Sequence, residues 1–315
     1  MQYLRDIKEN ERVVEHYLCK QKQTLKTKSG KDYFSLKMQD KTAVVDAKVW
    51  DINEDIGDFD EGDVIKIDAF VQLYHSEPQL KIARIRKSED GEYDMKEYLP
   101  STEKDIDELY GKLLDFIDSM SQPHLRRLLE LIILDHEIIS KAIASHSAAK
   151  SMHHSYLGGL LEHTVSVAEI CDFMSSRYKF VNRDLLITAA ILHDIAKIFE
   201  LSPMPSNNYT DDGQMLGHIY MGAELVSQEC AKIPDFPHTL QSLLKHAILA
   251  HHGEYEFGSP KLPMIMEAHI LHQADNMDAK AKVYEDAIAA NTIASNTWLG
   301  YHKLLARYLR NSNYE

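Results

Sequence analysis

The sequence predicts two domains of different fold class: a small β-barrel in residues 1–90 and, after a linker at 91–101, an all-α domain in residues 102–315. Two observations predict this division. Apolar and polar residues alternate with a period of two in the first part, whereas beyond the linker apolar residues recur at the three-to-four spacing of amphipathic helices. A chain of 315 residues is long enough for each domain to bury its own core.

Period-two segments in the first part indicate short strands. Phe34–Met38 and Val45–Val49 alternate, Ile65–Leu73 follows the turn at Gly62, and Leu80–Arg86 gives another strand. About five short strands without a long helix favour a small closed barrel. The OB-fold is the leading candidate, although periodicity alone does not separate it from an SH3-like barrel.

The outer face of this barrel is a candidate binding surface. In an OB-fold, the second and third strands bind the ligand. Aromatic and basic side chains would combine there, as in proteins that bind single strands; a core position for the aromatic residues is the alternative. The candidates for this face are Tyr33, Lys37, Lys48 and Trp50.

The charge is unevenly distributed. A net charge of −14 is awkward for a protein that contacts phosphate, which normally requires a basic surface. Lysine is nevertheless concentrated in residues 20–41, where the only acidic residues are Asp32 and Asp40. A local basic hairpin is enough to guide a nucleic acid strand, and a solvated lysine-rich loop is the alternative.

The composition is that of a soluble globular protein, with 44% hydrophobic and 27% charged residues. The chain does not begin with an apolar signal segment, and no apolar run approaches membrane-spanning length. Cys19, Cys171 and Cys230 are widely scattered, which argues against a disulfide framework. We therefore expect a cytoplasmic location and no membrane partner.

The second part of the chain is predicted to be helical. Thr102 with Asp105 predicts a capping box for its first helix, and helical spacing continues nearly throughout to Arg310. Two irregular segments, at 202–213 and 253–263, interrupt this pattern. Loops of this kind are natural walls for a substrate channel.

One short segment of the helical part, Ile191–Lys197, places His193 beside Asp194 in an apolar pattern. Burying these groups costs free energy unless something binds them. Helical spacing points His193 toward the core and places Lys197 one turn beyond the pair. Taken alone, the pair favours a core histidine that is satisfied by a hydrogen bond over a ligand.

Further histidines and an aspartate follow the same pattern. His163 lies in the apolar stripe of a preceding helix, and the other candidates are His218, His251, His252 and Asp275. Five histidines and two carboxylates suit a pair of borderline-hard divalent ions, with one aspartate able to bridge both. The order His, His-Asp, His, His-His, Asp therefore predicts a two-metal centre.

This order of ligands resembles the two-metal form of the HD superfamily of metal-dependent phosphohydrolases. Residues 153–164, 213–219 and 251–260 further resemble the YhaM-type 3′→5′ exoribonucleases, in which an OB-fold precedes the HD domain. The resemblance covers nearly the whole chain. It implies a metal-dependent enzyme that degrades single-stranded RNA, with single-stranded DNA and self-association into a homo-oligomer left open.

The resemblance also implies roles for residues. Asp194 would bridge two ions and, with Lys197, act in catalysis, and a hydroxide activated by both ions would attack the phosphodiester. Mn²⁺ is favoured, and Co²⁺, Fe²⁺, Mg²⁺ and Zn²⁺ remain alternatives. His153 and His154 precede two glycines and lack a clear helical face, so they are expected to bind the substrate phosphate or to support the metal ligands, and metal ligation is the alternative. The implied ligands are His163, His193, Asp194 and Asp275 for the first ion, and Asp194, His218, His251 and His252 for the second.

Two alternatives to a nuclease remain at this point. One is a nucleotide or cyclic-nucleotide phosphohydrolase whose barrel has a regulatory or oligomerisation role. The other is a single-strand-binding protein without catalysis, which the complete ligand set disfavours. The 3′→5′ direction rests on the resemblance, because residue spacing does not encode polarity.

Overall fold

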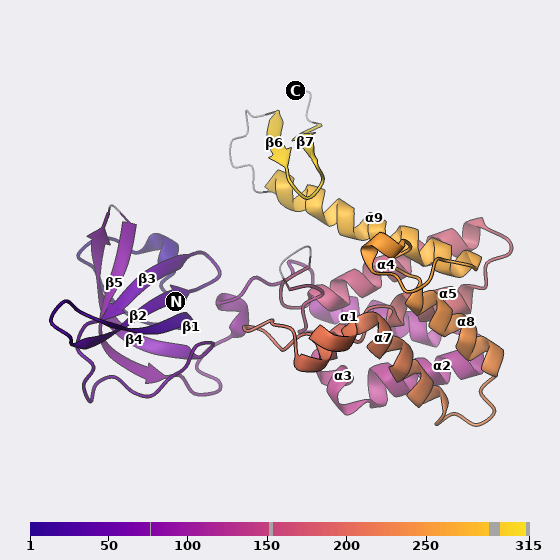
Figure 1. Ribbon diagram of the computed structural model, residues 1–315, viewed down its shortest axis with the longest axis horizontal. Helices are drawn as coiled ribbons and strands as arrows, with labels where there is room; N and C mark the ends of the chain where they lie inside the picture. Colours follow the sequence, from indigo (N-terminus) through magenta and orange to yellow (C-terminus); the bar gives the residue numbers. More distant parts are fainter. Residues whose placement is uncertain (76, 151–153, 290–296, 313–315) are drawn as a thin grey trace. The chain divides into compact units, whose positions relative to one another are not determined.

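The computed structural model describes residues 1–75, 77–150, 154–289 and 297–312. The chain forms two compact units (Figure 1). The first comprises Met1–Ser101 with Met204–Ser206, and the second comprises Thr102–Pro203 with Asn207–Glu315.

The first unit contains a closed five-stranded barrel, which confirms the predicted fold class. Its strands are hydrogen-bonded in the order β1-β2-β3-β5-β4, and β3 pairs with β5 in parallel. A register shift between Cys19 and Gln21 interrupts the pairing of β1 with β2, and the same long strand also pairs with β4. The strands are β1 (Arg12–Lys26), β2 (Asp32–Gln39), β3 (Val44–Val49), β4 (Val64–Tyr74) and β5 (Glu77–Lys87).

The segment that follows the barrel packs against it. A short 3-10 helix, η2 (Met95–Glu97), precedes Tyr98 and Leu99, which are both buried. The Gln39 side-chain amide donates to the Tyr98 carbonyl at 3.0 Å. Residues 91–101, predicted as a linker, thus contribute buried side chains to the first unit. A further 3-10 helix, η1 (Leu4–Asp6), lies near the N-terminus.

The second unit is a helical bundle followed by a short hairpin. Its main elements are α1 (Ile106–Asp118), α2 (Pro123–Leu129), the π-helix η3 (Glu130–Asp135), α3 (Glu137–Ala142), α4 (Gly159–Arg177), α5 (Arg183–Leu192), α6 (Lys197–Glu200), α7 (Asp211–Cys230), α8 (His238–Leu249), the 3-10 helix η4 (Tyr255–Phe257), α9 (Met266–Ala289), β6 (Trp298–His302) and β7 (Arg307–Arg310).

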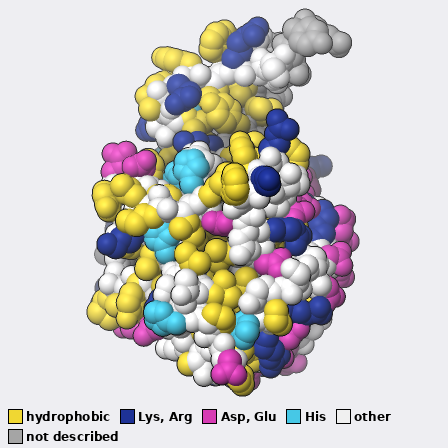
Figure 2. Space-filling view, turned by 90° about the vertical axis from the view of Figure 1, so that its right-hand side faces the viewer, with side chains coloured by type: hydrophobic (Ala, Val, Ile, Leu, Met, Phe, Trp, Pro, Cys, Tyr) yellow, Lys and Arg dark blue, Asp and Glu magenta, His cyan; other side chains and the backbone are white. Residues whose placement is uncertain are grey.

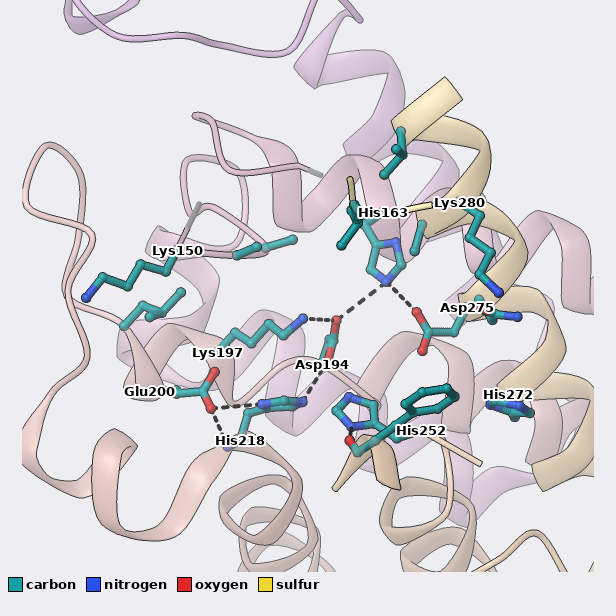
Figure 3. A pocket seen from close by; sticks show the side chains of 18 of the residues that line it. Lys150, His163, Asp194, Lys197, Glu200, His218, His252, His272, Asp275 and Lys280 are labelled. Carbon is teal, nitrogen blue, oxygen red and sulfur yellow. Dashed lines mark hydrogen bonds and ion pairs between the residues drawn. The ribbon is translucent and has the colours of Figure 1, made fainter. Parts of the chain in front are cut away.

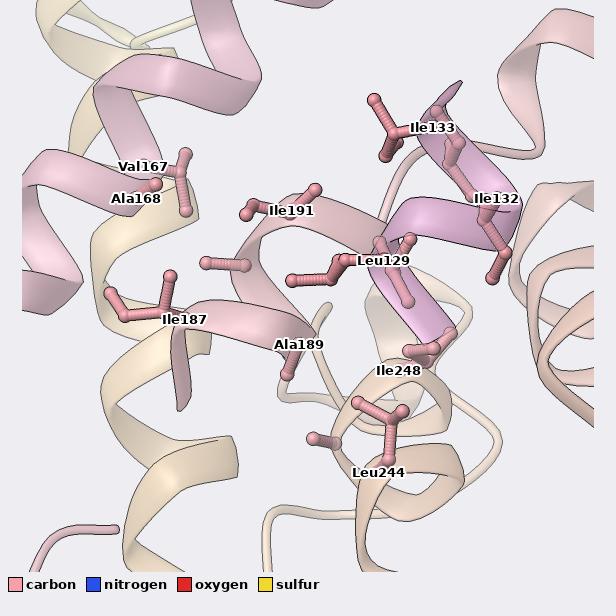
Figure 4. Close-up of a cluster of buried hydrophobic side chains, with 14 of the residues drawn as sticks. Leu129, Ile132, Ile133, Val167, Ala168, Ile187, Ala189, Ile191, Leu244 and Ile248 are labelled. Carbon is pink, nitrogen blue, oxygen red and sulfur yellow. The ribbon is translucent and has the colours of Figure 1, made fainter. Parts of the chain in front are cut away.

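Helix α5 lies at the centre of the bundle. The Asn182 side chain caps its first turn, and every residue from Asp184 to Leu192 is buried. A helix that is apolar on all sides must be surrounded by protein, and α5 packs against α4, α8 and α9. Ile187 and Ile191 lie among side chains of α2, α4 and α8 (Figure 4). This packing fixes the end of α5, where His193 and Asp194 follow.

Three sequence expectations for this unit were wrong. The first helix is capped by Asp105, whose carboxylate accepts from two backbone N–H groups, and not by Thr102, which bonds Glu162 instead. The chain turns at residues 193–196, so the predicted continuous helix through His193 ends there. Residues 298–310 form the hairpin of β6 and β7 and not a helix.

A spanning segment was neither predicted nor found in the part of the chain that the structure describes. None of the helices there is both long enough and apolar enough to cross a membrane.

Candidate metal centre

The predicted ligands come from five parts of the helical unit, and five of the seven line one cavity of about 600 Å³ (Figure 3): His163, Asp194, His218, His252 and Asp275. His163 comes from α4, and His193 and Asp194 follow α5. In α7, Gly217 adopts φ 75° and interrupts the helix immediately before His218. His251 and His252 follow the end of α8, and Asp275 lies in α9.

Asp194 lies between two groups of histidines, and its two carboxylate oxygens face different groups. Oδ2 lies 3.5 Å from His163 Nε2 and 3.4 Å from His193 Nε2. Oδ1 lies 3.4 Å from His218 Nε2 and 3.7 Å from His251 Nε2. A carboxylate divided in this way has the geometry required of a bridging ligand.

The remaining ligand atoms complete two clusters. His163 Nε2 lies 3.3 Å from Asp275 Oδ1 and 3.2 Å from His193 Nε2. The ligand atoms of His163, His193 and Asp275 lie within 4.8 Å of one another, as do those of His218, His251 and His252. Described residues therefore form groups that could hold metal ions on both sides of Asp194.

The ring orientation of each histidine supports metal binding. In all five, Nδ1 lies within hydrogen-bond distance of a fixed acceptor, which favours the tautomer that presents Nε2 to a metal ion. The acceptors are Asp278 for His163 at 2.7 Å, Ala190 O for His193 at 2.8 Å, Glu200 for His218 at 2.9 Å, Ile248 O for His251 at 2.7 Å and Phe257 O for His252 at 2.8 Å.

Several of these atoms are buried without a hydrogen-bond partner among the described residues: Asp194 Oδ1, His218 Nε2 and His251 Nε2. Unpartnered buried polar atoms are rare because each loses its contacts with water. Three of them in one cluster, all acceptors, are satisfied together by a cation. The residues present therefore fit a divalent metal ion.

The ionisation of His251, His252 and Asp194 agrees with this conclusion. His163 differs, because the effect of burial is outweighed there by hydrogen bonds to Asp194, Asp275 and Asp278, which raise its pKa well above the ordinary value. Burial lowers the pKa of His251 well below its ordinary value and also lowers the pKa of His252, so both rings are neutral at pH 7. Burial opposes the ionisation of Asp194, but the charges of Lys197 and His193 outweigh it and hold the pKa of Asp194 well below its usual range. Neutral imidazoles beside an ionised carboxylate are the forms that bind metals.

Lys197 reaches the same carboxylate from the first turn of α6. Its Nζ donates to Asp194 Oδ2 at 2.6 Å, and its side chain lines the cavity (Figure 3). The attraction of Asp194 outweighs the effect of burial and raises the pKa of Lys197, so the ammonium stays charged. Lys197 therefore supplies a positive charge to the cavity, held in place beside Asp194.

Sequence reasoning missed two carboxylates that orient the ligands. Asp278 accepts from His163 and also hydrogen-bonds His154 Nε2 at 3.0 Å. Glu200 accepts from both the ring and the backbone N–H of His218, at 2.9 and 3.0 Å. Each lies three residues beyond a predicted site residue, Asp275 and Lys197, and therefore on the same helical face. That spacing is the signal by which they could have been found.

The two histidines predicted to act near the substrate differ in what can be said of them. His153 lies outside the described residues. His154 is buried, and its contacts with Asp278 and with the Tyr156 hydroxyl, at 3.0 Å each, place it behind His163. Behind His163, His154 is placed to support that ligand through Asp278, and a role at the substrate stays a prediction.

A close contact ties the histidine pair to α9. Gly253 adopts φ 78°, and a Cβ there would lie within 2.4 Å of three atoms of the His272 ring. That ring donates from Nδ1 to His251 O at 2.9 Å. Glycine is thus required next to the two histidines by both backbone and space.

The barrel residues predicted to bind a strand lie on one outer face. Ser35 pairs with Lys48 and Lys37 with Asp46 across β2 and β3. The rings of Tyr33 and Trp50 stack, with centroids 4.6 Å apart. Lys37 pairs with Asp46 at 2.9 Å, and Lys48 donates to Ser35 at 2.6 Å. The structure thus brings the aromatic pair together with two lysines that already have partners.

Residues 160–280 match the family model described as "HD domain". The helical unit therefore carries an HD domain, the class of protein to which its histidines and aspartates pointed. The chain is 33% identical over 262 residues to the 3′-5′ exoribonuclease YhaM of Geobacillus sp. (strain WCH70), which covers 82% of this chain and 80% of that protein. It is 32% identical over 281 residues to the 3′-5′ exoribonuclease YhaM of Bacillus subtilis (strain 168), which covers 88% of each.

The chain belongs to the YhaM exoribonuclease family. Among solved structures, the second OB-fold domain of replication protein A from Methanococcus maripaludis covers 29% of this chain and 98% of that chain, at 16% identity and a TM-score of 0.24. That likeness is too weak to carry an argument.

Proposed function

We propose that this protein is a metal-dependent 3′→5′ exonuclease that hydrolyses the phosphodiester bonds of single-stranded RNA. The observation that carries the proposal is the divided carboxylate of Asp194, with histidine Nε2 atoms facing each of its oxygens. Relatives that cover most of the chain are named 3′-5′ exoribonucleases, which supports both the substrate class and the direction.

Two divalent ions fit the two clusters. Manganese is our choice because imidazole and carboxylate ligands together suit it better than they suit Mg²⁺. When bound, the ions supply an activated water nucleophile and neutralise charge on the phosphate. We propose His163, His193, Asp194 and Asp275 for one ion, and Asp194, His218, His251 and His252 for the other.

The residues of the chain position the substrate. Lys197 Nζ lies in the cavity beside Asp194, where it can donate to a non-bridging phosphate oxygen as negative charge increases. Tyr209 and Phe257 line the same cavity and offer rings to a terminal base, and Lys150 adds a second cation. The volume of about 600 Å³ is in the range of pockets for small ligands, which suits one nucleotide at the end of a strand.

The first unit would capture the rest of the strand. We propose that Tyr33 and Trp50 stack with bases, that Lys37 and Lys48 contact phosphates, and that residues 1–90 and 102–315 are the binding and catalytic domains. Single-stranded DNA is a second candidate polymer, because stacking does not require a 2′-hydroxyl. We also propose a cytoplasmic location, which the free cysteines of the described chain support.

The test is the degradation of a single-stranded RNA twenty-mer by the full chain with Mn²⁺. A label at the 5′ end should give a ladder that shortens from the 3′ end, and a label at the 3′ end should appear at once as mononucleotide. The Asp194→Asn variant, purified identically, controls for contaminating nuclease. A matched DNA strand measures the preference between polymers.

Two results would contradict the proposal. Internal cleavage without a ladder would exclude an exonuclease. Hydrolysis of mononucleotides or cyclic nucleotides at a higher kcat/KM than that of the twenty-mer would establish the small-molecule phosphohydrolase instead.

A further inference from the structure

The C-terminal hairpin of β6 and β7 is a feature that the metal centre does not explain. Its inner side packs on α9: Leu305 and Leu309 form a small buried cluster with Val283. Figure 1 shows the hairpin at the end of that helix. Its position is therefore fixed by apolar contacts within the helical unit.

The outer side of the hairpin presents aromatic rings. Trp298 pairs with Arg310 and Tyr301 with Tyr308, so each pair projects from the same face. Tyr308 and Arg310 are two residues apart on β7, which places both pairs on one face. The three rings are 63%, 55% and 69% exposed for Trp298, Tyr301 and Tyr308. Large rings in such a position are available to a partner.

The hairpin is also basic, in a chain of net charge −14. Lys303, Arg307 and Arg310 are exposed, and residues 287–314 contain no aspartate or glutamate. In the part of the chain that the structure describes, none of these three cations has an ion-pair partner, unlike the barrel's Lys37. In Figure 2, mainly hydrophobic and basic side chains colour the upper part of the helical unit, where the hairpin lies.

The turn of the hairpin borders the catalytic cavity. Leu304 and Leu305 line that cavity together with Asp194 and Lys280. Leu304 is 54% exposed, so it lies where the cavity meets the surface. A strand whose terminal phosphodiester lies at the metal centre can leave the cavity at this edge, beside the exposed rings.

We propose that the β6–β7 hairpin binds single-stranded nucleic acid, stacking bases on Trp298, Tyr301 and Tyr308 and contacting phosphates with Lys303 and Arg310. Exposed aromatic rings among unpaired cations are the combination that holds single strands without sequence preference. A second copy of the chain fits this face less well, because a two-fold contact would bring like charges together. The inference rests on the proposed function and adds a binding surface outside the barrel.

The test compares two variants of the full Mn²⁺-loaded chain. Lys303→Gln/Arg310→Gln removes two cations, and Trp298→Ala removes the ring outside the Tyr301–Tyr308 pair. The matched control is Lys179→Gln/Phe180→Ala, which removes an exposed cation and a ring that is 87% exposed, both from the loop between α4 and α5. The probe is a 5′-fluorescein single-stranded RNA twenty-mer with phosphorothioate linkages, measured by anisotropy between 50 and 300 mM salt.

We expect each hairpin variant to raise Kd by roughly tenfold and the double charge variant to lower the salt slope by about 1.4, while the control matches the wild type. Trp298→Phe should restore most of the affinity lost in Trp298→Ala, because phenylalanine also stacks with bases. If Trp298 acted only through packing, a ring of different shape would not be expected to restore the affinity. Thermal melting confirms that each variant is folded.

Two outcomes would overturn the inference. One is wild-type affinity and salt slope in both hairpin variants. The other is a change in molar mass by light scattering, which would make the hairpin an interface between copies. A degradation assay with unmodified RNA tests the proposed function separately. If the wild type does not degrade this RNA but the hairpin variants bind the probe more weakly than the wild type, the exonuclease is refuted and the binding surface is retained.

Discussion

The metal centre and the outer face of the barrel differ in how their polar groups are satisfied. At the centre, Asp194 and the rings around it are buried, and several of their atoms lack hydrogen-bond partners among the described residues. On the barrel, Lys37 and Lys48 each have a partner from the neighbouring strand, and Trp50 is 37% exposed.

This difference teaches how each region can be recognised. A buried cluster whose polar atoms lack hydrogen-bond partners specifies the kind of ligand that would satisfy those atoms, here a cation. An exposed face with its own ion pairs specifies only a class of partner, because water and neighbours already satisfy it. Substitutions at the centre should therefore act on the rate of reaction, and substitutions on the barrel should act on the affinity for long strands.

The largest effect should come from Asp194→Ala. Among the described residues, Asp194 is the one carboxylate whose oxygens face both histidine groups, so both proposed metal sites lose a ligand in this variant. We expect hydrolysis to be abolished and the metal content, measured by inductively coupled plasma mass spectrometry, to fall. Asp172→Ala, which removes a surface partner of Arg183, is the control. A tenth of the wild-type rate with both ions retained would show that Asp194 is not the bridge.

Lys197→Met should come next. It keeps most of the aliphatic stem but removes the charge beside the cavity, so kcat should fall by roughly a hundredfold with little change in thermal stability. Lys232→Met is the matched control, since Lys232 also pairs with a carboxylate three residues away but lies at the surface. A normal kcat with a lower melting temperature would make Lys197 a packing residue.

Asp278→Asn tests whether the orienting carboxylates matter. The amide keeps the size of the side chain but weakens the hold on His163 Nδ1–H. We expect metal affinity or activity to fall by about tenfold to a hundredfold, the usual range for such partners. The control is Asp286→Asn, whose exposed carboxylate pairs with Lys282. Titration with Mn²⁺ should restore the rate at high metal concentration, and failure to do so would place the defect outside metal binding.

Trp50→Ala should have the smallest effect and the most selective one. Loss of a ring from the stacked pair with Tyr33 should weaken binding of a twenty-mer by roughly tenfold and leave a dinucleotide nearly unaffected. Ile52→Ala, another exposed apolar residue of the same unit, is the control. Equal losses of affinity for the twenty-mer and the dinucleotide would show that Trp50 acts through folding. The barrel face would then not differ from the metal centre in its selectivity for long strands.

The sequence was sufficient to predict residues and strands whose side-chain chemistry and hydrophobic periodicity indicate the same structure. His163 and His193 stand out because imidazoles in apolar stripes need a partner, and β2 and β3 because their alternation is strict. The first strand was not located, because β1 changes partners along its length and its burial does not alternate. Asp278 and Glu200 were missed because helical carboxylates are common, and their three-residue spacing from Asp275 and Lys197 is a weak signal until the fold places them against His163 and His218.

The hairpin shows a different limit. Its rings and leucines lie close to helical spacing, and a bulge between Trp298 and Gly300 interrupts strand alternation. What makes it a hairpin is the apolar cluster with Val283, a tertiary contact that a local window does not contain.

The contact between Gly253 and His272 couples the position of the segment that carries His251 and His252 to the position of α9. A Cβ at 253 would overlap the His272 ring, so any larger residue there must displace that ring and the hydrogen bond that it donates to His251 O. Since α9 also carries Asp275 and Asp278, that hydrogen bond joins the two histidines to the helix of a proposed ligand and of the support of His163. A single methyl group at 253, which itself binds nothing, would thus disturb the segment that carries His251 and His252.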